Sequence, residues 1–239
     1  MPVTYEQLAR MIDHSLLHPT LTEEQLRQGC ELAKQYQVAT VCIKPYAVPM
    51  AAELLRGSGV GVGTVAGFPH GSEPVEIKRR QIEWAAQAGA KEIDVVVNIG
   101  KVLSHDWNYV EQEVQQLCHE AHQHQMIFKL IIETDYLPSD DLKITLCRIG
   151  SAAGVDFMKT STGFGFVRGE DGRYFYRGAT EHDVRLLRSH CPPQVQIKAA
   201  GGIRTLEALL RMRELGVSRC GMTATKQVLD TFREKFGMA

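Results

Sequence analysis

Short apolar runs alternate with longer amphipathic stretches along the whole chain. The short runs show little polar alternation, which is typical of strands buried on both faces, as in a parallel sheet. We predict eight strands, at Met11–Leu16, Ala39–Ile43, Gly61–Gly67, Glu92–Ile99, Phe128–Glu133, Asp156–Thr160, Gln194–Ala199 and Arg219–Thr223. The stretches that follow them predict eight helices, at Glu23–Gln37, Ala47–Arg56, Val75–Ala88, Val110–His124, Ser139–Ala153, Thr180–Ser189, Thr205–Leu215 and Lys226–Phe236.

This alternation divides 239 residues into eight strand–helix units. Each unit has about 30 residues, the usual size of a βαβ element. Eight is the number that closes a parallel barrel, so the predicted fold class is α/β, a (β/α)8 TIM barrel. An open doubly wound sheet is the alternative, but its glycine fingerprint after the first strand is missing. No linker rich in Pro, Gly or Ser interrupts the pattern, so we expect residues 1–239 to form a single domain.

One segment breaks the rhythm. Residues 165–178, after the sixth predicted strand, are punctuated by glycines and rich in aromatic and basic residues. Loops this long are uncommon and are often functional lids. We expect the Arg168–Gly178 loop either to cover a phosphorylated ligand or to be a surface hairpin without a role.

The composition excludes several classes of protein. With 27 Lys and Arg against 28 Asp and Glu, the net charge is −1, which argues against a nucleic-acid binder. No apolar run approaches the ~20 residues of a membrane helix, and the N-terminus has no export signal. Six cysteines stand singly, which is typical of reduced thiols. We therefore expect a cytoplasmic protein without nucleic-acid or membrane partners.

Two lysines stand within apolar strands, Lys159 in the sixth and Lys198 in the seventh. Burying an unpaired charge is costly, so each lysine needs a partner or a function. Neighbouring strands lie about 4.8 Å apart, so the two ammonium groups are expected to approach each other. A nearby like charge and desolvation both lower a lysine pKa, which is one route to a Schiff-base nucleophile.

Asp94 occupies the middle of the fourth predicted strand. Alternate strands of a barrel supply the same interior layer, so Asp94 is expected beside Lys159. Such a group can move protons in an aldol cleavage, which deprotonates a hydroxyl and later protonates a carbon. The alternative is structural: one lysine forms an internal salt bridge with Asp94 or Glu133.

Glycine-containing turns follow the last two strands, at Gly201-Gly202 and at Gly221-Met222-Thr223. Turns before a helix expose backbone N–H groups to an anion, and barrel enzymes often hold phosphate there. His119, His122 and His124 resemble a metal cluster, but they fall at the polar end of a helix, so no metal is expected.

The segments Lys159–Phe164 and Lys198–Thr205 resemble the deoxyribose-phosphate aldolase family. The resemblance covers nearly the whole chain in order and extends through Ile12–Leu17, Val41–Ile43, Phe68–Gly71, Glu92–Val96 and Lys129–Thr134. It implies a class I aldolase on a TIM barrel that uses no metal or cofactor. The family reversibly cleaves 2-deoxy-D-ribose 5-phosphate to D-glyceraldehyde 3-phosphate and acetaldehyde.

The resemblance also implies roles for individual residues. Lys159 matches the Schiff-base lysine, Lys198 the lysine that lowers its pKa, and Asp94 the proton-relaying aspartate. The residues expected to contact substrate are Asp13, Cys42, Lys129, Thr160, Gly163, Gly201, Gly202, Arg204, Gly221, Met222 and Thr223. The expected partners are a sugar phosphate or aldehyde and a second copy of the chain, in a homodimer.

Three features depart from the family pattern. Lys44 stands where an uncharged residue is common, Met222-Thr223-Ala224 replaces a smaller turn that contains serine, and the Arg168–Gly178 loop is longer than usual. Three alternatives therefore stay open. The first is a Schiff-base aldolase for another or an unphosphorylated substrate. The second is a phosphosugar isomerase with Asp94 as acid–base group and Lys159 as a clamp. The third is a non-catalytic protein that binds a phosphometabolite.

Overall fold

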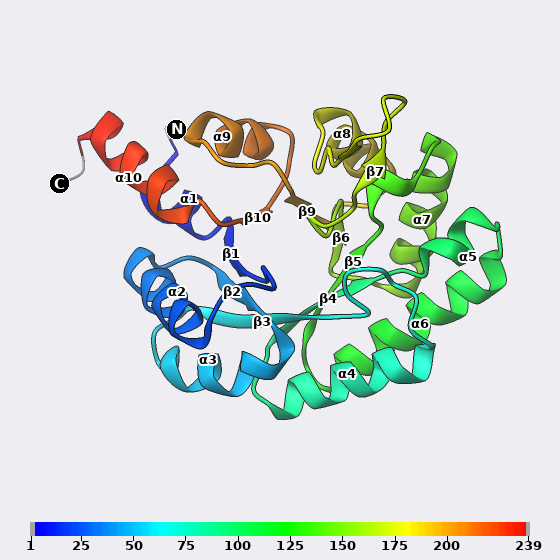
Figure 1. The fold of residues 1–239 in the computed structure, drawn as a ribbon, viewed down its shortest axis with the longest axis horizontal. Coiled ribbons are helices and arrows are strands. Elements are labelled where there is room, and N and C mark those ends of the chain that lie inside the picture. The colour runs from blue at the N-terminus through cyan, green and yellow to red at the C-terminus, as the bar shows by residue number, and fades with distance from the viewer. Residues whose placement is uncertain (1–2, 238–239) are drawn as a thin grey trace.

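Eight parallel strands close into a barrel, and the connecting helices form a ring around it (Figure 1). The computed structural model describes residues 3–237. The barrel strands are β1 (Ile12–Leu16), β2 (Thr40–Ile43), β3 (Gly61–Ala66), β4 (Glu92–Val96), β5 (Ile127–Ile131), β6 (Phe157–Lys159), β9 (Gln196–Ala200) and β10 (Arg219–Met222). Around the barrel they follow the order β1-β10-β9-β6-β5-β4-β3-β2. The predicted (β/α)8 fold is confirmed.

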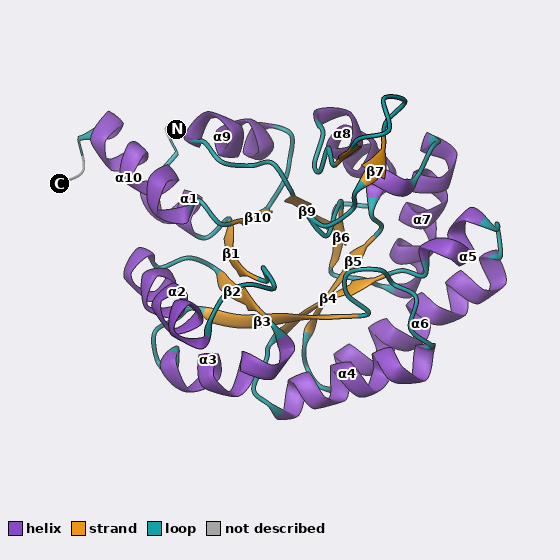
Figure 2. Ribbon diagram, viewed as in Figure 1, coloured by secondary structure: helices purple, strands orange, loops and turns teal. Residues whose placement is uncertain are grey.

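Helices lie outside this barrel on every side (Figure 2). The α-helices are α1 (Tyr5–Ala9), α2 (Glu23–Tyr36), α3 (Val48–Leu54), α4 (Val75–Gln87), α5 (Ile99–Leu103), α6 (Trp107–Gln123), α7 (Asp140–Ala153), α8 (Glu181–His190), α9 (Leu206–Glu214) and α10 (Thr225–Phe236). Short 3₁₀ turns cover Pro45–Ala47 and Thr134–Tyr136. No helix in the described part of the chain is long and apolar enough to cross a membrane.

The predicted elements are all present, but several boundaries differ and some short elements were not predicted. The fourth strand stops at Val96, not Ile99, because the Asn98 side chain accepts a hydrogen bond from Lys101 N (3.1 Å) and starts α5. Helix α1 was missed, although Thr4 and Gln7 form a capping box at its start. The second predicted helix is divided into a 3₁₀ turn and the shorter α3.

The Arg168–Gly178 loop contains a small antiparallel hairpin, β7 (Val167–Arg168) with β8 (Tyr174–Phe175). Its tip is fastened by a hydrogen bond from Gly169 N to Arg173 O (2.8 Å). Tyr174 and Phe175 are exposed. The hairpin stands beside α8, above the barrel in the view of Figure 1.

The hydrophobic core includes apolar residues of both the strands and the helices, such as Ile93, Ile197, Leu117 and Phe232. Fully burying one such side chain stabilises the fold by about 1.5–3 kcal/mol. The barrel interior is different, because it holds buried charged side chains, namely Asp13, Glu92, Asp94, Lys129, Lys159 and Lys198. Buried charges are costly unless they are paired, so their concentration here marks the candidate site.

Candidate active site

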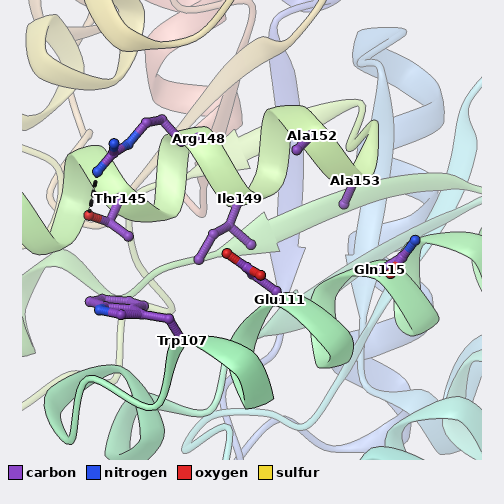
Figure 3. Close-up of a pocket in the computed structure, with 8 residues that line it drawn as sticks. All are labelled: Trp107, Glu111, Gln115, Thr145, Arg148, Ile149, Ala152 and Ala153. Carbon is purple, nitrogen blue, oxygen red and sulfur yellow. Dashed lines mark hydrogen bonds between the residues drawn. The ribbon is translucent and has the colours of Figure 1, made fainter.

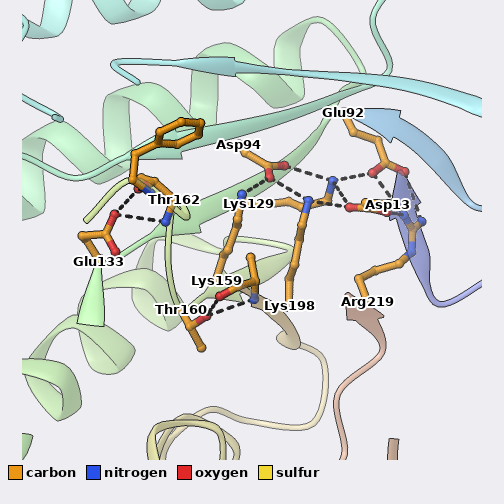
Figure 4. Close-up of polar contacts among 12 residues, drawn as sticks. Asp13, Glu92, Asp94, Lys129, Glu133, Lys159, Thr160, Thr162, Lys198 and Arg219 are labelled. Atoms are coloured by element: carbon orange, nitrogen blue, oxygen red, sulfur yellow. Dashed lines mark hydrogen bonds and ion pairs between the residues drawn. The ribbon is translucent and has the colours of Figure 1, made fainter. Parts of the chain in front are cut away.

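Lys159 and Lys198 face each other across adjacent strands and share one carboxylate oxygen (Figure 4). Their Cα atoms are direct partners in the β6–β9 register. Lys159 Nζ donates to Asp94 Oδ2 at 2.6 Å, and Lys198 Nζ donates to the same oxygen at 2.7 Å. The two nitrogens are therefore at most about 5.3 Å apart. The structure thus brings together the three residues that the sequence analysis predicted to be catalytic.

A second layer of charges lies on the other side of Asp94. Lys129 Nζ contacts Asp94 Oδ1 (3.1 Å), Glu92 Oε2 (2.5 Å) and Asp13 Oδ2 (3.3 Å). The Arg219 guanidinium contacts Asp13 Oδ1 (2.5 Å) and Glu92 Oε1 (3.1 Å). Lys198 also contacts Asp13 Oδ2 (2.5 Å). The sequence analysis missed Glu92 and Arg219. Glu92 could have been found, because residues two apart on a strand face the same side.

We define the charge cluster as seven side chains: the carboxylates of Asp13, Glu92 and Asp94, and the cations of Lys129, Lys159, Lys198 and Arg219. Fully ionised, it carries four positive charges against three negative ones. Lys159 is the only one of the four cations that contacts a single carboxylate of the cluster. Deprotonating Lys159 balances the cluster at three against three.

The directions of the pKa shifts within the charge cluster agree with this balance of charges. Burial lowers the pKa of Lys159. The positive charge of Lys198 lowers it further, and the negative charge of Asp94 opposes both effects without cancelling them. For Lys198 burial acts in the same sense, but the carboxylates of Asp13 and Asp94 outweigh it and raise the pKa. Lys129 behaves like Lys198, with its pKa raised well above the ordinary value. Burial opposes ionisation of Asp94 as well, but Lys129, Lys159 and Lys198 hold its pKa well below the usual range. Lys159 is therefore the lysine of this cluster best placed to be a neutral amine.

A cavity of about 260 Å³ opens at the ends of the strands next to Lys159. Ten of the predicted site residues line it, namely Asp13, Cys42, Lys159, Lys198, Gly201, Gly202, Arg204, Gly221, Met222 and Thr223. The sequence analysis missed Ser15, Leu17, His18, Thr162, Phe164, Tyr176, Ala200 and Ile203, which also line it. Most of these residues follow a strand or lie in the loop after it. Their position after a strand could therefore have identified them as cavity-lining residues.

Four predicted site residues lie outside the lining. Asp94 and Lys129 belong to the charge cluster next to the cavity. The Thr160 hydroxyl accepts a hydrogen bond from Ala200 N (3.2 Å) and thereby joins β6 to β9. Gly163 has a φ of +87°, which favours glycine, and it forms the turn between Thr162 and Phe164. Thr160 and Gly163 therefore shape the cavity without lining it in this structure.

Glu133 holds the loop that forms one wall of the cavity. It follows β5 with a φ of +50°, and its Oε2 accepts hydrogen bonds from Thr162 N (3.0 Å) and from the Thr162 hydroxyl. The same hydroxyl oxygen accepts from Phe164 N (2.9 Å). Burial raises the pKa of Glu133. Of the two partners that the structural alternative named, Asp94 pairs with both lysines, and Glu133 pairs with neither.

Other candidate groups lie away from the chemistry. Lys44 Nζ donates to Leu21 O (2.8 Å) and Pro19 O (3.3 Å), so it fastens the loop after β1. Burial raises the pKa of the Cys42 thiol to about 11, which keeps the thiol protonated. His122 pairs with Asp156 at 2.9 Å. Between residues 3 and 237, no three His, Cys, Asp or Glu side chains gather as a metal site.

A larger surface cavity, about 530 Å³, lies between α6 and α7 (Figure 3). Its ionisable groups are Glu111 and Arg148, and Arg148 donates to Thr145 Oγ1 at 3.0 Å. It has no buried nucleophile or base in its lining. Volume alone therefore does not locate the chemistry of this protein.

Comparison with known proteins agrees with this geometry. Residues 8–226 match the model of the DeoC/LacD family aldolase. The deoxyribose-phosphate aldolase of Rhodopirellula baltica is 45% identical over 234 residues, which is 98% of this chain and 92% of that protein. The one from Thermococcus gammatolerans is 40% identical over 228 residues, or 95% of this chain and 96% of that protein.

A solved structure shares the fold. The deoxyribose-phosphate aldolase of Aeropyrum pernix, described as a unique tetramer, superposes with a TM-score of 0.85 at 30% identity. The superposition covers 97% of this chain and 93% of that one. The match runs from end to end, and it includes the strands that carry Lys159, Lys198 and Asp94. The chain therefore belongs to the DeoC/LacD aldolase family.

Proposed function

We propose that this protein reversibly cleaves 2-deoxy-D-ribose 5-phosphate to D-glyceraldehyde 3-phosphate and acetaldehyde, with Lys159 as the Schiff-base nucleophile. The observation that carries the proposal is the pair of lysines on one Asp94 oxygen, in which only Lys159 has a lowered pKa. A neutral amine next to a cavity is the group needed to attack an aldehyde. The names of the relatives support the choice of substrate.

The first steps join Lys159 to the sugar. The neutral amine attacks C1 of the open-chain aldehyde and forms a carbinolamine, with a proton passing from nitrogen to oxygen. One further proton, delivered through an ordered water, lets the hydroxyl leave as water and gives a protonated imine; this proton is released again when the imine is hydrolysed. Asp94 Oδ2 lies within hydrogen-bond distance of the Lys159 nitrogen and stabilises that positive charge.

The imine then draws electrons from the bond that breaks. A base removes the proton of the C3 hydroxyl, the C2–C3 bond cleaves, and D-glyceraldehyde 3-phosphate leaves. The enamine left on Lys159 takes a proton at C2, and water hydrolyses the imine to acetaldehyde and free amine. We assign the proton transfers to Asp94 with an ordered water, because Asp94 contacts both lysines and is ionised at neutral pH.

Positioning of the phosphate is assigned to the turns after β9 and β10. Gly201 and Gly202 precede α9, and Thr223 precedes α10. All three line the cavity, together with the exposed Arg204. Backbone N–H groups before a helix and a guanidinium are both suited to an anion. A phosphate held there would orient the aldehyde end toward Lys159.

Borohydride trapping tests the covalent step. The enzyme is mixed with acetaldehyde, reduced with sodium borohydride and mapped by peptide mass spectrometry. We expect one ethylated lysine, Lys159, and loss of the label in Lys159→Met. The matched control is Lys129→Met, which removes another buried lysine of the charge cluster but leaves Lys159 available. A wild-type enzyme that turns over substrate without a labelled Lys159 favours the isomerase-type alternative and overturns the proposal.

We further infer that the chain forms a homodimer through an apolar face on α4. Ile77 and Trp84 lie seven residues apart on α4 and are 49% and 43% exposed. Residues seven apart share one side of a helix, so they form a stripe. Tyr46 is exposed in the 3₁₀ turn that precedes α3. Light scattering after gel filtration should give twice the chain mass, and Trp84→Glu should give a monomer. A monomeric wild type at micromolar concentration contradicts the inference.

We also retain the proposal of a cytoplasmic location. It is supported by six free cysteines, every one of them buried. Persistent thiols are typical of reducing compartments. Fractionation of the source cell, followed by immunodetection, checks this assignment.

A further inference from the structure

The hairpin of β7 and β8 is the feature that the proposed reaction does not use. Its stem is fixed at several points, unlike an unattached surface loop. Tyr136 OH donates to Phe166 O (3.3 Å), and Asp135 Oδ2 accepts from the N–H groups of Arg177 and Gly178 (3.0 Å each). Ala179 N donates to Ala200 O (3.0 Å). These bonds join the hairpin stem to the loop after β5 and to the end of β9.

Two glycines bring the stem into direct contact with the turn after β9. A Cβ atom on Gly178 would lie 2.8 Å from the carbonyl carbon and oxygen of Gly201. A Cβ atom on Gly201 would lie 2.9 Å from Gly178 Cα. Both residues have positive φ, +68° and +90°, which favours glycine. The close approach therefore depends on having no side chain at either position.

Tyr176 follows β8 and uses this approach to reach the cavity. Its Cε2 atom lies 3.3 Å from the place that a Cβ on Gly201 would occupy. The ring lines the cavity with Phe164 and Arg204, and it forms a T-shaped pair with the ring of Phe166 at a centroid distance of 5.8 Å. Tyr176 is half-buried, whereas Tyr174 of the same hairpin is 69% exposed. Of these two tyrosines, the hairpin thus presents one to the site and one to solvent.

We propose that Tyr176 is a specificity-determining residue: its ring covers the Gly201–Gly202 turn and favours substrates that carry a terminal phosphate. The inference rests on the proposed function and adds to it the structural element that sets phosphate preference. A ring packed against the turn excludes water from one side of the anion site. Contacts of the phosphate with backbone N–H groups and with Arg204 are stronger where water is excluded. An unphosphorylated sugar leaves the turn empty and gains little from the ring.

The test compares two substrates in the full-length enzyme. For Tyr176→Ala we expect KM for 2-deoxyribose 5-phosphate to rise about tenfold with kcat little changed, since the lost contact is with the phosphate end of the substrate and not with the reacting carbon atoms. KM for unphosphorylated 2-deoxyribose should stay within about twofold. The ratio of kcat/KM for the two substrates then falls about tenfold. Tyr174→Ala, on the exposed side of the hairpin, is the matched control and should keep the wild-type ratio.

Binding of inorganic phosphate, measured by calorimetry, gives a readout that needs no turnover. We expect its Kd to rise about tenfold in Tyr176→Ala and to stay unchanged in Tyr174→Ala. Equal losses on both substrates, or an unchanged phosphate Kd, overturn the inference while leaving the aldolase proposal intact. Absence of turnover on either sugar in wild type overturns the proposed function, and the phosphate Kd still decides the role of Tyr176. Where Tyr176→Ala lowers the melting temperature, Tyr176→Leu repeats the test with more of the packing kept.

Discussion

Replacement of Lys198 by methionine should move the acid limb of the pH–rate profile to higher pH. In the proposed reaction only neutral Lys159 attacks the aldehyde, so the rate should rise with pH as Lys159 loses its proton. Lys198 holds a positive charge within about 5.3 Å of the Lys159 nitrogen. At that separation and an effective dielectric constant of about 20, two unit charges repel by about 3 kcal/mol. Such repulsion lowers the pKa of Lys159, in the same direction as burial does.

The variant also changes the charge count. Without Lys198, the charge cluster has three cations and three carboxylates when Lys159 is protonated, so the balance now favours the ammonium form. We expect the acid limb to shift upward by about two pH units. Below that limb, kcat/KM should fall about 100-fold. At high pH, Lys159 is neutral in both enzymes, so the kcat/KM of Lys198→Met should come closer to that of the wild type.

The assay is kcat/KM for retro-aldol cleavage between pH 5 and 10, with the aldehyde product measured by a coupled dehydrogenase. The position of the limb is the readout, because loss of a substrate contact would lower the plateau without moving the limb. The control is Lys78→Met/Glu113→Gln, which neutralises another fully buried ion pair (2.9 Å) outside the charge cluster. A Lys198→Met enzyme with an unmoved limb would refute the electrostatic role of Lys198.

Three further predictions use the same cluster. Arg219→Met also removes one cation, but from a residue that touches Asp13 and Glu92 and not Asp94, so the acid limb should shift in the same direction by less than in Lys198→Met; a larger shift contradicts the geometry. Asp94→Asn keeps the shape but loses the charge, and kcat should fall about 10²–10⁴-fold in the coupled assay; a fall below tenfold argues against a proton-transfer role. Asp13 and Asp94 have pKa values well below their unfolded ones, so their stabilisation is fully present above the unfolded pKa of about 4 and is lost progressively as pH falls from there through the folded pKa values. Urea midpoints at pH 7 and pH 3 should show this loss, and Asp94→Asn should show a smaller one.

Much of the fold was accessible from the sequence. Eight apolar runs at regular spacing predicted eight buried parallel strands, and eight such strands form the barrel. Some errors were missed short elements such as α1, and others were element ends, where a single capping side chain overrides the apolar pattern. The run after Glu92 continues through Val97, for example, but the Asn98 side chain caps α5 and the strand stops at Val96.

The sequence also indicated which residues to examine in the barrel. A lysine within an apolar strand has few structural explanations, so Lys159 and Lys198 were evident without coordinates. Substrate-contacting residues were harder to predict. Position in a motif did not distinguish Thr160, whose hydroxyl bonds to β9, from Thr162, which lines the cavity.

The tertiary structure decided which lysine of the pair has the lowered pKa and where the hairpin goes. A pKa depends on charges within a few ångströms, and those around Lys159 come from strands far apart in the chain. Lys198 reaches Asp94 across 104 residues, and Arg219 reaches Asp13 across 206. The contact between Gly178 and Gly201 is likewise set by how two loops meet. Periodicity along a chain fixes which elements form, because it is local, whereas charge balance and cavity shape depend on distances that only folding defines.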